Sequence, residues 1–246
     1  MKEACPHCKS TEIIRYGHTR HKKQNYLCKS CGKQFSNLTI KEAEPTAQDL
    51  DEAQLIRAFQ SRMSLRRMSF VFAVSIASLT KFLINQGKDL AILTIQQMDY
   101  ILENVPTITL ECDEMHTFIG KKSEKRWIWI AKDRKTGLII AYHVGMRDTA
   151  SCKEFYEKIP LNIRTKARFV TDQWSVYGNI LPQSQHFPQD NRGETNHIER
   201  FNGTLRAFCS RLVRKTYSFS KKLENLTHHL NIVIFQHNKR TLSPLP

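Results

Sequence analysis

Hydrophobic residues recur along most of this chain at the spacing of helices or strands, and the pattern divides it into three segments. Residues 47–86 have helical spacing and contain neither glycine nor proline. Residues 107–187 alternate between strand-like and helical runs, and residues 196–235 are helical. Residues 1–41 carry few large apolar side chains, and residues 42–46 resemble a linker. The pattern predicts an α+β chain with several domains, bounded at 1–41, 46–100 and 104–246.

The second segment predicts three short helices joined by tight turns. Thr46 or Asp49 is expected to cap the first helix, and the third is expected to end before Gly87. The apolar positions are Leu50, Ala53, Leu55, Ile56 and Phe59, then Leu65, Met68 and Phe72, then Ile76, Leu79, Phe82 and Leu83. With a tight junction at residues 72–75, this order matches a helix-turn-helix. The alternative is a plain helical spacer, because apolar periodicity does not distinguish the two.

A helix-turn-helix would place its third helix, starting near Ser75, in a DNA major groove. Such a helix would present Ser78, Thr80 and Lys81 to the bases. Arg66 and Arg67 would lie near the DNA backbone.

The third segment predicts a mixed sheet flanked by helices. The expected strands are residues 107–113, 126–131, 137–144, 167–172 and 185–187, with a turn at 133–137. The expected helices are residues 151–159, residues 174–180 and a long helix from Asn196. Three strands, helix, strand, helix, strand and long helix is the element order of an RNase H-like domain.

The long helix carries an apolar stripe and a polar edge. The stripe consists of Ile198, Phe201, Leu205, Phe208 and Leu212. Glu199, Asn202 and Arg206 lie on the neighbouring face. Taken alone, these three residues are typical of a solvated helix surface.

Three acids change that interpretation. Asp113 ends the first predicted strand, Asp172 ends the fourth, and these strands are neighbours in an RNase H-like sheet, with Glu199 on the helix above. Three converging carboxylates need a compensating charge. Two Mg²⁺ or Mn²⁺ ions, which prefer oxygen ligands, would supply it and would support phosphoryl transfer. The alternative for each acid alone is a turn or cap residue.

Other polar residues surround the predicted triad. Glu111, Glu114 and Glu194 are candidate outer groups, and Arg206 would hold a DNA phosphate. Asn196 and Asn202 either orient Glu199, touch DNA or line a polar edge.

Four of the seven cysteines form two C-x-x-C pairs at Cys5, Cys8, Cys28 and Cys31. Two such turns present four thiolates to one structural zinc ion, so residues 1–41 are predicted to be a zinc ribbon. His7 and His18 are expected on its surface. Residues 1–45 hold nine Lys and Arg against four Asp and Glu, so the ribbon either contacts DNA phosphates or docks a protein.

The formal net charge of +15 favours a nucleic-acid partner. The part from residue 191 adds ten Lys and Arg, among them Arg211, Arg214 and Lys215, against three Asp and Glu. The helical run at residues 223–235 is expected to pack in the core, with dimerisation as the alternative. No apolar run is long enough to span a bilayer and no signal peptide is recognisable, so a cytoplasmic protein is expected.

The chain resembles the insertion-sequence-one family of DDE transposases, in the form that joins the small DNA-binding protein (InsA) to the catalytic segment (InsB). The resemblance covers residues 5 to about 220. Besides the ribbon and the helix-turn-helix, it rests on residues 111–115, Thr171-Asp172-x-Trp174-x-x-Tyr177, residues 198–206 and residues 211–215. One departure is His116, where the family tends to have Trp.

The resemblance implies a DDE triad of Asp113, Asp172 and Glu199, with Arg206 as the basic residue after the glutamate. It implies a prokaryotic, nucleoid-associated enzyme that binds double-stranded DNA at terminal inverted repeats, cleaves it and joins the 3′-hydroxyl ends to target DNA. A homodimer or higher oligomer is expected because the ends come in pairs. The alternatives are a catalytically inactive DNA-binding regulator and a ribonuclease H-type nuclease.

Overall fold

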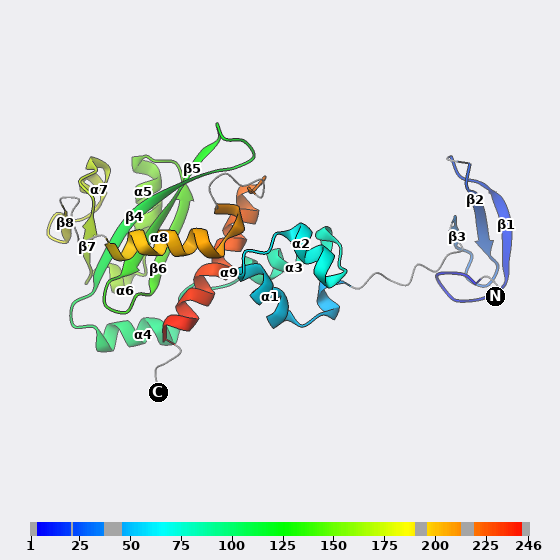
Figure 1. Cartoon of the computed structure of the whole chain (residues 1–246), viewed down its shortest axis with the longest axis horizontal. Helices are drawn as coiled ribbons and strands as arrows, with labels where there is room; N and C mark the ends of the chain where they lie inside the picture. The colour runs from blue at the N-terminus through cyan, green and yellow to red at the C-terminus, as the bar shows by residue number, and fades with distance from the viewer. Residues whose placement is uncertain (1–3, 21, 37–45, 190–195, 213–218, 243–246) are drawn as a thin grey trace. The chain divides into compact units, whose positions relative to one another are not determined.

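The computed structural model describes residues 4–20, 22–36, 46–189, 196–212 and 219–242. The chain forms two compact units, Met1–Pro45 and Thr46–Pro246 (Figure 1). The predicted residues Glu194, Arg214 and Lys215 lie outside the described residues, and so does the side chain of Asn196.

The first unit is a small antiparallel sheet of β1 (Ile13–His18), β2 (Gln24–Cys28) and β3 (Gln34–Phe35), in that order. Strands β1 and β2 form an antiparallel hairpin in which Ile13 pairs with Cys28. Its described hydrophobic core consists of Cys5, Cys28 and Phe35, with Ile13 and Tyr26 packed against them. Because so little apolar surface is buried, this unit needs a further source of stability.

The second unit begins with η1 (Ala47–Asp49), α1 (Glu52–Gln60), α2 (Leu65–Phe72) and α3 (Ile76–Lys88). Serine side chains cap the last two helices, Ser64 at α2 and Ser75 at α3. Between them Ala73 adopts a left-handed backbone (φ 52°) and the helix axes turn by 112°. Within the described residues no single helix is long and apolar enough to cross a membrane, although the bent pair α2 and α3 passes that test when taken together.

Two details of this helical part were predicted incorrectly. Thr46 and Asp49 form a capping box on η1, and α1 is capped instead by Asp51, whose side chain accepts the Ala53 backbone N–H. Helix α3 does not stop before Gly87 but continues to Lys88. A Cβ atom at position 87 would lie 2.3 Å from the carbonyl oxygen of His228, so glycine is required here by close packing and not by a helix end.

The remaining elements build a five-stranded mixed sheet in the order β6-β5-β4-β7-β8 (Figure 1). Strands β4, β5 and β6 are antiparallel, whereas β7 runs parallel to both β4 and β8. The strands are β4 (Thr109–Phe118), β5 (Lys125–Asp133), β6 (Ile139–Gly145), β7 (Arg168–Thr171) and β8 (His186–Pro188). The helices are α4 (Ile95–Asn104), α5 (Thr149–Glu157), α6 (Leu161–Arg164), α7 (Ser175–Ile180), α8 (Asn196–Phe208), η2 (Ser210–Leu212) and α9 (Leu223–Leu242).

The predicted order of the strands along the chain is confirmed, and the first and fourth predicted strands (β4 and β7) are neighbours in the sheet. One strand is longer than expected. Strand β4 does not end at Asp113; it continues to Phe118, paired with β5 as far as Lys125. This antiparallel pairing satisfies the backbone of β4 beyond the point where β7 stops at Thr171. Asp113 therefore lies within a strand. Helices α4 and α6 were not predicted, although Thr94 and Gln97 form a capping box at the start of α4.

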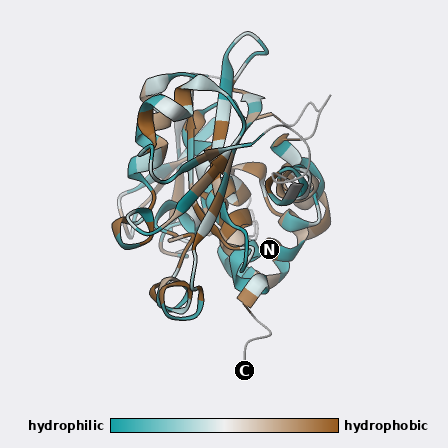
Figure 2. Ribbon diagram, turned by 90° about the vertical axis from the view of Figure 1, so that its left-hand side faces the viewer, coloured by the Kyte–Doolittle hydropathy of each residue, from teal (hydrophilic) through white to brown (hydrophobic). Residues whose placement is uncertain are grey.

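Hydrophobic residues pack on both faces of the sheet, where brown stretches run along the strands in Figure 2. One core lies under α4, α5 and α7 and includes Trp129 and Phe155. The other lies under α8 and α9 and includes Phe201 and Leu230, so the predicted core role of residues 223–235 is confirmed. This second core also contains Phe59, Leu79 and Leu83 from α1 and α3. Residues 46–100 thus share one continuous core with the sheet, and the predicted domain border at 100–104 stays a prediction.

Candidate active site and metal centre

The pairing of β4 with β7 brings two of the predicted acids together. Thr109, Leu110 and Glu111 pair in parallel register with Arg168, Phe169 and Val170. Extended by two residues, this register brings Asp113 level with Asp172, the residue that follows β7. Neighbouring residues of parallel strands point to the same face, so the two carboxylates share one side of the sheet edge where β7 ends.

Side chains alternate along β4, and helix α8 covers the face to which Asp113 points. Asn202 of α8 donates a hydrogen bond from Nδ2 to Oδ2 of Asp113 over 2.7 Å. The Asn202 side chain is buried, and its Oδ1 has no hydrogen-bond partner within the described residues. Asn202 therefore faces Asp113 and not solvent, a contact that none of its three predicted roles included.

Buried Glu111 binds the start of α8 to the sheet. Its Oε2 accepts the backbone N–H of Ile198 over 2.9 Å, and its Oε1 accepts Nε of Arg134 over 2.8 Å. Lys132 adds a hydrogen bond from Nζ to the carbonyl oxygen of His197 over 3.1 Å. A carboxylate at the first turn of a helix is favoured by the helix dipole and by the unpaired N–H groups there. Glu111 thus fixes the turn that carries Glu199.

The pKa of Asp113 is raised by burial and by three neighbouring acids. Burial is the main reason that the pKa of Asp113 is raised to about 6, and a backbone hydrogen bond at Glu114 lowers it only in part. The negative charges of Glu114, Asp172 and Glu199 also raise this pKa. Asp113 consequently holds its proton more tightly than an ordinary aspartate, unless a cation compensates the local charge.

The three acids are not clustered as tightly as the ligands of a single ion. Within the described ranges, the only group of three or more His, Cys, Asp or Glu side chains whose ligand atoms all lie within 4.8 Å of one another is the cysteine group. Glu199 is exposed on α8, whereas Asp113 is partly buried. An oxygen-ligated site formed by these acids would therefore be open on the α8 side.

A second buried acid lies behind the pair, on the opposite face of β4. Glu114 accepts the Tyr177 hydroxyl at Oε2 over 2.8 Å and Nε of Arg147 at Oε1 over 2.8 Å. The Arg147 guanidinium is sandwiched between two indole rings, 4.9 Å from the Trp127 centroid and 4.3 Å from the Trp174 centroid. This network ties β4 to the β6–α5 loop and to α7.

The same network fixes the turn that follows β7. Asp172 accepts the backbone N–H of Trp174 at Oδ1 over 3.1 Å, and Trp174 stacks on Trp129 with ring centroids 5.5 Å apart. Glu114, Trp174 and Tyr177 belong to the motifs noted in the sequence, but Arg147 was not recognised. It lies in a loop between β6 and α5, where no spacing pattern links it to Glu114.

The predicted DNA-contact residues have different environments. Lys81, Arg66 and Arg67 are exposed. Ser78 and Thr80 are half-buried, and both hydroxyls make internal contacts: Ser78 accepts the backbone N–H of Ala47, and Thr80 donates to the Ile76 carbonyl. Their DNA contacts stay predictions.

The candidate residues of the basic C-terminal part also differ. Arg206 is half-buried on α8, and it contributes to lowering the pKa of His116, for which burial is the main cause. His116 is exposed and packs edge-on against Trp127. Arg211 points inward and donates to His229 and Ser220.

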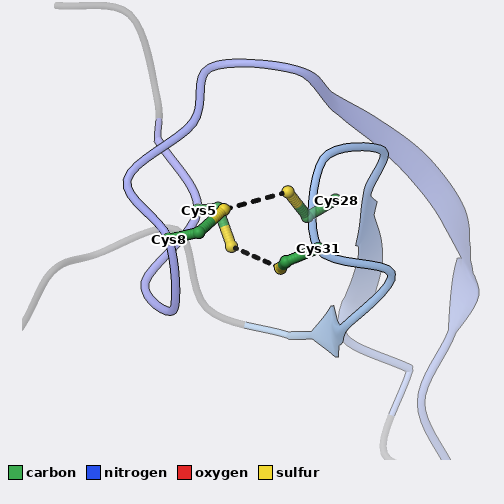
Figure 3. Close-up of side chains that lie close together, drawn as sticks. All are labelled: Cys5, Cys8, Cys28 and Cys31. Atoms are coloured by element: carbon green, nitrogen blue, oxygen red, sulfur yellow. Dashed lines mark hydrogen bonds between the residues drawn. The ribbon is translucent and has the colours of Figure 1, made fainter.

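The four cysteines of the first unit form a compact metal-binding group. Figure 3 shows their side chains pointing toward one another, with Cys5 Sγ 3.7 Å from Cys31 Sγ and Cys8 Sγ 3.5 Å from Cys28 Sγ. A tetrahedral ion with zinc–sulfur bonds near 2.3 Å separates its ligands by about 3.8 Å. The group is therefore the right size for a metal ion such as zinc. His7 and His18 are exposed and are not part of the group.

Hydrogen bonding within this group stabilises a thiolate. Burial acts to raise the pKa of Cys28, but hydrogen bonds from the Cys31 backbone and the Cys8 thiol lower it to about 6. A backbone hydrogen bond from Ser10 acts to lower the pKa of Cys8, whereas the hydrogen bond with Cys28 and burial raise it to about 12. The pair therefore shares one proton at neutral pH, and thiolate is the form that binds metal.

Comparison with known proteins agrees with this picture of the second unit. Residues 107–240, more than half of the chain, match the family model described as IS1 transposase. The insertion element iso-IS1n protein InsB of Shigella dysenteriae is 37% identical over 115 residues, which cover 46% of this chain and 84% of that protein. The insertion element IS1 4 protein InsB of Escherichia coli (strain K12) is 32% identical over 134 residues, covering 52% and 77%.

A third relative is matched over almost its whole length. The insertion element IS1 protein InsB of Shigella flexneri is 32% identical over 133 residues, covering 52% of this chain and 98% of that protein. The matched region contains the five-stranded sheet with Asp113 and Asp172, and the helix with Glu199. The chain belongs to the IS1 transposase family.

Proposed function

We propose that the protein is the DNA transposase of an insertion sequence, with an RNase H-like second unit in which Asp113, Asp172 and Glu199 form a DDE triad. The observation that carries this proposal is the parallel register of β4 and β7, which, extended by two residues, brings Asp113 level with Asp172. Helix α8, which bears Glu199, covers the same face of β4 through the contact between Asn202 and Asp113. The sheet order β6-β5-β4-β7-β8, with its first three strands antiparallel, supports the same fold assignment.

The three acids suit two Mg²⁺ or Mn²⁺ ions. Carboxylate oxygens are the preferred ligands of these ions, and ligands shared between two ions spread over a wider site than those of one. The raised pKa of Asp113 and the unpartnered Oδ1 of buried Asn202 indicate a site that lacks positive charge. Bound ions would activate the attacking oxygen and neutralise charge on the transferred phosphate.

The protein's own residues position the carboxylates and the DNA strand. Glu111 and Asn202 hold α8 and Asp113 together, and the Glu114 network holds the Asp172 turn. In the first step a water oxygen bonds to phosphorus at a terminal inverted repeat while the bond to the 3′-oxygen breaks, which frees a 3′-hydroxyl. In the second step the oxygen of this hydroxyl bonds to a phosphorus of target DNA while the bond from that phosphorus to its 3′-oxygen breaks, which frees a 3′-hydroxyl on the target strand. Neither step requires a covalent bond to the enzyme.

Several features support binding of double-stranded DNA. The net charge is +15, and the α2–α3 pair has the bend of a helix-turn-helix with exposed Arg66, Arg67 and Lys81. The first unit would act as a zinc ribbon holding one structural Zn²⁺. The fused InsA–InsB arrangement, a dimer or higher oligomer, and a cytoplasmic, nucleoid-associated location belong to the same proposal.

Cleavage of a labelled inverted-repeat end tests the triad. The wild-type protein should cut the end in the presence of Mg²⁺, whereas Asp113→Ala, Asp172→Ala and Glu199→Gln should not. Glu157→Gln, at an exposed position on α5, is the matched control and should cut normally. Equal cleavage by all variants would exclude the triad. Absence of cleavage by the wild type with retained end binding would favour an inactive regulator, and preference for an RNA–DNA hybrid would favour a ribonuclease H.

A further inference from the structure

A cavity lies where the helices α1 and α2 meet η2 and the start of α9. Its volume is about 540 Å³. Arg66, Arg211, Lys221 and His229 line it together with two serines and a set of apolar side chains, and none of the described lining residues is acidic. The polar part of this cavity is therefore cationic, and none of Asp113, Asp172 and Glu199 lines it.

His229, one of the lining residues, carries a buried ring nitrogen that has no hydrogen-bond partner among the described residues. His229 is 1% exposed and packs edge-on against Phe59, with ring centroids 4.8 Å apart. Its Nδ1 accepts a hydrogen bond from Nε of Arg211. Arginine can only donate, so Nδ1 carries no proton and the neutral ring holds its proton on Nε2. That Nε2 has no hydrogen-bond partner within the described residues.

Charge and burial keep His229 in this neutral form. Burial, with the Arg211 charge and His228, lowers the pKa of His229 well below its usual value. Burial also lowers the pKa of Arg211, but a guanidinium stays charged in a protein. The described contacts of Arg211 are His229 and the Ser220 hydroxyl, and neither of them neutralises its charge. A partly buried cation without a neutralising partner is costly unless an anion joins it.

The structure assigns this cavity to a phosphate group of a DNA strand, held by Arg211, Lys221 and Arg66. Every one of these groups donates hydrogen bonds, and none accepts, which selects an oxyanion over a cation or a neutral amide. The cavity is larger than one phosphate requires. Its apolar part, which includes Met63, Ile76 and Phe219, is suited to the adjoining sugar or base.

The basic residues of the cavity come from two different parts of the second unit. Arg66 comes from the helix-turn-helix part, whereas Arg211 and Lys221 follow the helix of Glu199 in the chain. One phosphate bound here would be held from both parts at once. The choice of DNA as its source rests on the proposed function, but the oxyanion site itself does not.

NMR of the full-length protein with isotope-labelled histidine side chains tests this inference directly. The protein carries Asp113→Ala, so that binding is measured without cleavage. Inorganic phosphate and a short single-stranded DNA should each shift the ring resonances of His229, and each should compete with the other. Arg211→Gln combined with Lys221→Ala should weaken phosphate binding by about tenfold to a hundredfold. Lys88→Ala, an exposed position outside the cavity, is the control and should bind normally.

Other results would contradict the oxyanion site, its assignment to DNA or the proposed function. Unchanged His229 resonances with both probes, or equal shifts in the double variant, would exclude the oxyanion site. A response to phosphate without a response to the oligonucleotide would exclude DNA as its source. Lys221→Ala alone, at an exposed position on the rim, tests the same contact if the double variant does not fold. If the wild-type protein does not cleave the inverted-repeat end but the His229 resonances still shift with phosphate, the proposed function is wrong and the oxyanion site remains supported.

Discussion

Asp113 has to lose its proton to bind a cation, yet its surroundings favour the protonated form. The folded chain raises the pKa of this carboxyl to about 6, chiefly by burial. A group with a raised pKa stabilises the folded state fully below its unfolded pKa, and this stabilisation is lost as the pH rises through the folded pKa. In the metal-free protein, Asp113 therefore contributes most to stability in acid and least above about pH 6.

The first prediction concerns this competition between protons and metal. The rise in melting temperature caused by Mg²⁺ should be small near about pH 5 and larger near about pH 7.5, because the ion displaces the proton of Asp113. Thermal denaturation with and without Mg²⁺ across this range measures the effect. In Asp113→Asn the pH dependence should be much weaker. The same pH dependence in this variant would assign the proton to another group.

The second prediction concerns the hydroxyl of Tyr177, which is buried against Glu114. Tyr177→Phe leaves one carboxylate oxygen without that donor, so it should lower the free energy of unfolding by about 1–3 kcal/mol. It should also raise the Mg²⁺ concentration needed for half-maximal cleavage, because the turn at Asp172 is less firmly held. Both quantities are measured on the purified variant.

The control for Tyr177→Phe is Tyr156→Phe, which removes a hydroxyl that makes no hydrogen bond within the described residues while its ring stays packed on Phe169. Its stability and Mg²⁺ dependence should be nearly normal. A stability loss in Tyr177→Phe with an unchanged Mg²⁺ dependence would mean that the Glu114 network is structural and does not position the acids.

At the scale of elements, local signals placed most helices and strands, but the contacts between them came from the fold. The caps Ser64 and Ser75 and the alternation in β5 and β6 act over a few residues, so they are readable from the sequence. The extension of β4 beyond Asp113 depends on β5, which lies next to it only in three dimensions. For the same reason Glu111 was recognised as a nearby acid, but its hydrogen bond to the start of α8 was not.

The third prediction concerns the contact between α3 and α9. Asn231 of α9 donates a hydrogen bond from Nδ2 to the Gly87 carbonyl over 2.7 Å, and a Cβ at Gly87 would overlap the backbone of His228. Gly87→Ala should push these helices apart and lower the free energy of unfolding by about 1–3 kcal/mol, despite the higher helix propensity of alanine. Gly178→Ala, where no atom lies within 4 Å of the added carbon, should change stability little. Equal stability of both variants in chemical denaturation would contradict this packing argument.

At the scale of the whole molecule, the chain consists of two units whose stability has different origins. The unit Thr46–Pro246 buries two hydrophobic clusters on the two faces of one sheet. The described residues of the unit Met1–Pro45 bury only a few apolar side chains beside four cysteines. Metal binding should therefore account for much of the folding free energy of the first unit and little of that of the second.

The fourth prediction follows from this difference. Elemental analysis should find one zinc per chain, and its removal by a chelator should unfold the first unit while leaving the second folded. Amide NMR spectra should then lose dispersion for residues 4–36 only. Cys28→Ser should reproduce this loss, whereas Cys152→Ser, at a buried position outside the metal-binding group, should retain the ion. A zinc-free protein with a folded ribbon would contradict the prediction.

The sequence by itself determined the two cysteine turns and the order of the five strands of the large sheet, and it singled out three acids as candidates. These features depend on the spacing of residues within one element or one turn, and such local spacing can be recognised directly in the sequence. The tertiary structure alone decided that β4 continues past Asp113, that Arg147 joins Glu114, that α1 to α3 share a core with α9, and that Arg211 points into a cavity at His229. Each of these depends on contacts between residues far apart in the chain, which form only when several elements pack together and no local pattern records them.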